Sequence, residues 1–214
     1  MSSRSGYEAG YNVAMSEPKT SERPRGDGQR RRERPEIPPE RREEALRQIR
    51  KVGDPVLRET AKPVSTFDDD LARLSRRMIR VMQDAPGIGL AATQLGVVRR
   101  VIVYQVDDEP VTLVNPEILS SSDETEVADE GCLSVPGVTV PVERPAEVRV
   151  RGNDIQGTPR DYEAADVEAR VIQHEIDHLD GVLILERTSR QERARALREL
   201  RERDAAAPVA GTGL

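Results

Sequence analysis

The sequence predicts an α+β fold in which mostly antiparallel sheets pack around a central metal-binding HExxH helix, followed by a C-terminal helix. Between residues 101 and 150, short runs rich in valine are separated by Pro, Gly, Asn and Asp, as is typical of strands joined by turns. Two other segments, around 71–82 and 164–179, repeat apolar residues at helical spacing. No internal repeat is visible, so we expect one folded domain.

The chain of 214 residues divides unevenly. Residues 1–42 are rich in Arg, Pro, Gly and Ser and contain almost no aliphatic residues, which predicts a disordered tail. We expect a passive tail in preference to a nucleic-acid arm or a transit peptide, because transit peptides are poor in acidic residues and this stretch contains Glu8, Glu17, Glu22, Asp27 and Glu33. The folded domain is expected at 43–204 and a flexible C-terminus at 205–214.

Composition narrows the functional classes. The formal net charge is -6, which gives no support for general nucleic-acid binding. No apolar run has the length of a membrane span, and the N-terminus lacks the apolar core of a secretory signal. The single cysteine cannot form a disulfide within the chain. We therefore expect a cytoplasmic protein.

The elements follow in order along the chain. A short helical stretch through Ala45 and Ile49 leads into the sequence GDPVL at 53–57. The next helix begins near three consecutive aspartates at 68–70, since negative charge is favoured at a helix N-terminus. Its buried face is expected to consist of Leu71, Leu74, Met78 and Met82, and it ends in the Pro- and Gly-rich stretch 84–89.

Four strands and two helices are expected after that stretch. The strands are 101–106, 111–114, 138–142 and 148–150. The helix at 164–179 has Gly181 as its C-terminal cap and one stripe made of Val167, Val171, His174 and His178. The last helix, 190–203, carries six arginines around a thin apolar stripe of Ala194, Leu197 and Leu200.

The only two histidines of the chain lie in the run QHEIDH at 173–178. Helical spacing puts His174 and His178 on one face, where they can share a metal ion, and Glu175 can reach a water on that ion as general base. Cys132 is the obvious third ligand, which leaves one position open for water. A solvated surface helix and a buried, inert cysteine are the alternatives. Metal chemistry is favoured because this arrangement of two histidines is improbable by chance.

Three segments stand out together: GIGLAATQ at 87–94, EGCLS at 130–134 and QHEIDH at 173–178. In this order and at these separations they resemble the three signature motifs of the peptide deformylase family. The sequence GDPVLR at 53–58 is similar to the usual N-terminal segment of that family, and Asn115, Pro116 and Arg144 stand where its members commonly have them. The resemblance covers roughly residues 46–200.

The resemblance implies a hydrolase that removes the formyl group from the N-terminal formylmethionine of newly synthesised polypeptides and releases formate. It implies one ferrous ion, which zinc or nickel can replace, held by Cys132, His174 and His178. A metal-bound water would attack the formyl carbon, with Glu175 as general base and then general acid. Nascent polypeptides that begin with formylmethionine are then its partners, and no binding to a membrane or to a specific nucleic-acid sequence is expected.

The resemblance also implies roles for residues around the metal. The Gln94 side-chain amide and the Leu133 backbone N–H would stabilise the oxyanion. The substrate-binding residues would be Gly87, Ile88, Gly89, Glu130, Gly131 and Val171, with Ile88 and Val171 lining the methionine pocket. Asp177 and Arg144 form either a pair that steadies the metal helix or a surface salt bridge. Many bacterial relatives have an Arg where this chain has Thr139; if that Arg helps to bind the peptide backbone, Thr139 would do so differently.

Two other functional classes remain open. An HExxH helix often belongs to a zinc peptidase, which takes its third ligand downstream, where Asp180 and Glu186 are the nearest acidic residues here. Alternatively, the three ligands stabilise a non-catalytic module that binds a partner. The Arg-rich last helix could make transient contact with the ribosome through its RNA, or it is simply solvated, because Glu192, Glu199, Glu202 and Asp204 nearly balance its charge.

Overall fold

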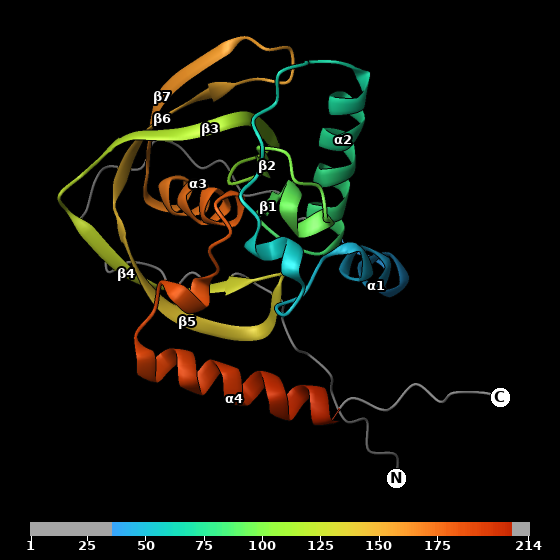
Figure 1. Ribbon diagram of the computed structural model, residues 1–214, viewed down its shortest axis with the longest axis vertical. Helices are drawn as coiled ribbons and strands as arrows, with labels where there is room; N and C mark the ends of the chain where they lie inside the picture. The colour runs from blue at the N-terminus through green and yellow to red at the C-terminus, as the bar shows by residue number, and fades with distance from the viewer. Residues whose placement is uncertain (1–35, 207–214) are drawn as a thin grey trace.

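The computed structural model describes residues 36–206, and helix α3 (Asp166–Leu179) lies at its centre (Figure 1). A five-stranded sheet covers one side of α3 and a two-stranded hairpin covers another. Helix α4 (Arg190–Ala206) packs against the outside of that hairpin. The predicted α+β class, with antiparallel sheets around the HExxH helix and a C-terminal helix, is confirmed.

The strands are joined in two antiparallel sheets. The larger sheet has the order β1-β2-β3-β6-β7, with β1 (Gly89–Ala91), β2 (Val101–Tyr104), β3 (Val111–Ser121), β6 (Glu147–Asn153) and β7 (Pro159–Ala165). The smaller sheet pairs β4 (Thr125–Cys132) with β5 (Val135–Pro145). Each of the four predicted strands overlaps an observed one, whereas β1, β4 and β7 were not predicted. The β4–β5 hairpin turns at two residues, Leu133 and Ser134. The second motif, EGCLS at 130–134, therefore lies at the tip of this hairpin.

Helices α1 (Pro39–Gln48) and α2 (Asp69–Asp84) pack against each other beside β1 and β2. Helix α2 begins where the Asp68 carboxylate accepts the backbone N–H of Leu71 over 2.9 Å, as an N-cap does. Helix α1 begins at Pro39, inside the segment expected to be disordered, because prolines at its start preset the helical φ angle. Residues 1–35 of that predicted tail, and the C-terminus beyond 206, lie outside the described residues.

Helix α3 begins two residues later than predicted, because Ala164 still pairs with Val148 in the sheet. It ends at Leu179 as predicted, and Gly181 follows with a left-handed φ of +75°. Single-turn 3₁₀ helices at Pro55–Arg58, Ala92–Leu95 and Ile184–Glu186 complete the fold. Among residues 36–206, none of the helices is both long and apolar enough to span a membrane.

Helix α4 buries a slightly different stripe from the one predicted. Ala196 and Leu200 are buried against β5 and Leu197 is partly buried, whereas Ala194 is exposed. The spacing of four residues between 196 and 200 follows one helix face, so the apolar contact is narrow. Most arginines of α4 therefore face solvent.

Candidate metal centre

The donor atoms of Cys132, His174 and His178 lie within 4.8 Å of one another, so the fold brings the three predicted ligands together. Cys132 ends β4, whereas the two histidines are one turn apart on α3. The Cys132 sulfur is 3.1 Å from His178 Nε2. A thiolate and two imidazoles suit a transition-metal ion such as zinc or iron, and three protein ligands leave one position open.

The surroundings of His174 and Cys132 also suit a divalent ion. Glu130 Oε2 lies 2.9 Å from His174 Nδ1, which fixes the ring so that its Nε2 is available to a metal. Burial raises the pKa of the Cys132 thiol, but the neighbouring imidazoles of His178 and His174 outweigh burial and hold that pKa well below its ordinary value. The thiolate is the form that binds metals.

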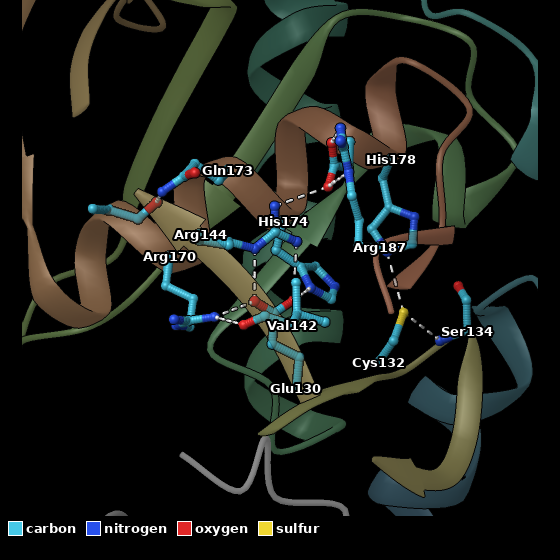
Figure 2. A network of polar contacts seen from close by, with 12 residues as sticks. Glu130, Cys132, Ser134, Val142, Arg144, Arg170, Gln173, His174, His178 and Arg187 are labelled. Carbon is cyan, nitrogen blue, oxygen red and sulfur yellow. Dashed lines mark hydrogen bonds and ion pairs between the residues drawn. The ribbon is translucent and has the colours of Figure 1, made fainter. Parts of the chain in front are cut away.

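Figure 2 shows Glu130 within a buried network of charges. Arg144 donates to its two carboxylate oxygens over 2.6 and 3.0 Å, and Arg170 donates to Oε1 over 2.9 Å. Arg144 also donates to Asp177 on α3 over 2.9 Å. The side chains of Arg144 and Asp177 are only 5% and 10% exposed, so their pair is buried and joins β5 to the metal helix.

Arg170 belongs to this network and was not predicted. It is buried one turn before His174 and donates to the backbone oxygens of Val142 (3.0 Å) and Glu126 (2.8 Å) as well as to Glu130. The spacing of four residues before His174 was the available signal, because it puts Arg170 on the ligand face of α3. An arginine is rarely buried without a charged partner. The partner of Arg170 is Glu130, forty positions earlier in the sequence.

Glu175 is the second buried glutamate of the site. Its side chain projects from α3 toward β1, where a Cβ added to Gly89 would lie 2.3 Å from Glu175 Oε1. Its Oε2 has no hydrogen-bond partner within residues 36–206. Burial raises the pKa of Glu175 to about 7, against the opposing effect of the two imidazoles. A carboxyl group that titrates near neutrality can both accept and return a proton.

Gln94 is held with its amide N–H₂ toward the ligands. Its Oε1 accepts the backbone N–H of Ala91 over 2.8 Å, and its Nε2 donates to Ser134 Oγ over 3.1 Å. The same nitrogen is 3.8 Å from the Cys132 sulfur. Because the oxygen is already bound to the backbone, the amide presents its donor side to the pocket.

The predicted substrate-binding residues line one pocket beside the metal ligands: Gly87, Ile88, Gly89, Glu130, Gly131 and Val171. Gln94, Leu133 and Glu175 line the same pocket. Glu130 differs from the others, because its carboxylate is already bound by two arginines and His174. Its geometry is that of a residue that orients His174, not of one that is free to bind a peptide.

A family model described as polypeptide deformylase matches residues 46–194 of the chain. The peptide deformylase of Dictyoglomus thermophilum is 49% identical over 142 residues, which cover 66% of this chain and 92% of that protein. That of Acidothermus cellulolyticus is 49% identical over 158 residues, covering 74% and 87% of the two chains.

Solved structures agree with these sequence matches. The crystal structure of peptide deformylase from Thermotoga maritima is 48% identical, with a TM-score of 0.65, over 66% of this chain and 96% of that one. The Synechococcus elongatus peptide deformylase in complex with actinonin is 44% identical, with a TM-score of 0.69, over 71% and 84%.

Proposed function

The chain belongs to the polypeptide deformylase family, and we propose that the pocket between β1, β4 and α3 is its active site. The enzyme is a hydrolase that removes the formyl group from the N-terminal formylmethionine of newly made polypeptides. The observation that carries the site assignment is the convergence of Cys132, His174 and His178 with a buried Glu175 on one pocket. When bound there, a metal ion supplies Lewis acidity at the formyl carbonyl.

Glu175 moves the proton in this proposal. Its carboxylate accepts a proton from the water that attacks the formyl carbon, and it delivers that proton to the amine nitrogen as the C–N bond breaks. A pKa of about 7, set by burial, supports both transfers, because neither the acid nor the base form is strongly disfavoured near neutral pH. Formate and a free N-terminal amine are the products.

The Gln94 amide and the Leu133 backbone N–H are proposed to stabilise the negative charge that develops on the formyl oxygen. The orientation of Gln94, with Oε1 bound by Ala91 N–H, supports this role because the amide cannot turn its oxygen toward the oxyanion without losing that bond. Removal of one such donor typically raises the barrier by about 3 to 4 kcal/mol.

The peptide is proposed to lie along Gly87, Gly89 and Gly131, where the absence of Cβ atoms permits close approach and strand-like pairing. Ile88 and Val171 are proposed to contact the methionine side chain, since both are apolar and line the pocket. Glu130 is assigned a positioning role through His174 in place of direct substrate binding.

We propose Fe²⁺ as the resident ion, with Zn²⁺ or Ni²⁺ able to substitute. The combination of one thiolate and two imidazoles accepts all three metals. Metal analysis of protein purified without oxygen, compared with protein purified in air, tests this. Iron near one equivalent only in the anaerobic sample is expected, and zinc in both samples would refute it.

The deciding experiment is formate release from formyl-Met-Ala-Ser by anaerobic, iron-loaded protein beside Glu175→Gln. We expect turnover by the first and not by the second, with metal retained in both. Cleavage of peptide bonds would favour a peptidase instead. Bound metal without any turnover would favour a non-catalytic binding module.

We further propose a cytoplasmic enzyme whose helix α4 makes transient contact with the ribosome. The exposed arginines of α4 support this, although Arg195 is already paired with Glu192 and Glu199. Deleting α4 would expose β5, so charge reversal at Arg198 and Arg201 is the better test. We expect the double variant to keep its turnover but to lose ribosome co-sedimentation at low salt, and unchanged co-sedimentation would refute the contact.

A further inference from the structure

Residues 50–52, between α1 and the first 3₁₀ helix, bond to two of the three motifs at once. The backbone N–H of Arg50 donates to the Gln94 carbonyl oxygen over 2.7 Å. The backbone N–H of Val52 donates to the Ser134 carbonyl oxygen over 2.8 Å. This segment therefore ties the backbone of the first motif to the hairpin tip of the second.

Lys51 lies between these two contacts and adds a charge. Its Nζ donates to the Leu133 carbonyl oxygen over 2.9 Å, across 82 positions of sequence. Burial lowers the pKa of Lys51, and the negative charge of Cys132 opposes that shift.

The oxygen that Lys51 contacts shares a peptide unit with a donor to the sulfur. The Leu133 carbonyl and the Ser134 N–H belong to the same planar amide, and that N–H donates to Cys132 Sγ over 3.4 Å. A positive charge at the oxygen end of an amide polarises its N–H end, because hydrogen bonds in a chain reinforce one another. Lys51, the amide and the sulfur thus form a chain of two hydrogen bonds, in which Lys51 donates to the amide and the amide donates to the thiolate.

We propose that Lys51 is a positioning residue that tunes the Cys132 thiolate through the Leu133–Ser134 peptide. The proposal rests on the metal site assigned above. A stronger N–H donor draws electron density from the sulfur, so the sulfur donates less charge to a bound ion and leaves that ion a better Lewis acid. Lys51 would also hold the hairpin tip in the orientation that Leu133 N–H needs.

The test uses cobalt(II)-loaded protein, whose sulfur-to-metal charge-transfer absorption reports directly on the thiolate. Lys51→Met removes the charge but keeps an unbranched side chain, Lys51→Arg keeps the charge, and Lys62→Met makes the same change at an exposed lysine. We expect Lys51→Met to move the band to longer wavelength and to lower kcat about tenfold with little change in KM. Lys51→Arg should restore most of both, and Lys62→Met should match the wild type.

The outcomes separate the proposal from the function on which it rests. A wild-type protein without the sulfur band would contradict the metal site itself. A wild-type band that Lys51→Met leaves in place, or that Lys51→Arg shifts as far as Lys51→Met does, would overturn the role of the lysine charge. Circular dichroism checks the fold, and if Lys51→Met does not fold, Lys51→Gln is expected to shift the band in the same direction.

Discussion

Gly89→Ala is expected to abolish most activity by displacing Glu175, not by unfolding the protein. The added Cβ would lie 2.3 Å from Glu175 Oε1, 2.9 Å from Cδ and 3.0 Å from Cγ. Non-bonded carbon and oxygen atoms need about 3.5 Å, so the carboxylate must retreat by about 1 Å. A misplacement of that size at a reacting group costs on the order of 100-fold in rate.

The assay is formate release, with kcat and KM measured separately and the metal content checked in each sample. We expect kcat to fall about 100-fold while the metal content stays near wild type, because the ligands do not move. Gly152→Ala is the matched control. Its Cβ would press on Leu113 at 2.9 Å in the five-stranded sheet, so it should lower the melting temperature but not kcat. A folded Gly89→Ala protein with wild-type kcat would refute the reasoning.

Three further predictions follow from buried or charged contacts. Arg170→Met should lower the free energy of unfolding by about 3 kcal/mol or more in urea, because it leaves the buried Glu130 with fewer partners. The control Arg149→Met, at an exposed ion pair, should cost less than about 1 kcal/mol, and equal losses would contradict this prediction. Burial raises the pKa of Glu186, but hydrogen bonds from the Leu183 N–H and Arg58 outweigh burial and hold that pKa below its ordinary value of 4.5. The ionised Glu186 therefore stabilises the fold above that pH. Glu186→Gln should therefore lower the melting temperature at pH 7, and the difference should vanish as the pH falls through the folded-state pKa; a constant difference would contradict it. Thr139→Arg, opposite Gly131 in the hairpin, should lower KM a few-fold without changing kcat, and an unchanged KM would show that an arginine there does not bind the peptide.

The three candidate ligands were predictable from the sequence because their chemistry is local or rare. His174 and His178 lie one helical turn apart, and Cys132 is the only cysteine. The strand that presents Cys132 was not predictable in the same way. Strand β4 reads TEVADEGC, with little β propensity, and its extended form depends on pairing with β5.

The supporting contacts were hidden for a related reason. Helical spacing puts Arg170 on the ligand face of α3 but does not reveal Glu130 as its partner, and Lys51 reaches Leu133 across 82 positions. Neither pairing follows from spacing along the chain. The sequence patterns therefore identified the atoms that could hold a metal, whereas the charges that orient those atoms appear only in three dimensions.

Glu130, which contacts the His174 ring, and Glu175, which follows His174 in the sequence, show why these distant contacts matter for the chemistry. Both are buried, and burial alone raises the pKa of each carboxyl group. For Glu130, hydrogen bonds from His174 and Arg144 reverse that effect, so it stays ionised and accepts the His174 N–H. No arginine among residues 36–206 pairs with Glu175, and its pKa rises to about 7. The arginines thus help to fix the charge of one carboxylate and leave the other with a pKa near neutrality, as the proposed proton transfer requires, a division that no property of glutamate itself could provide.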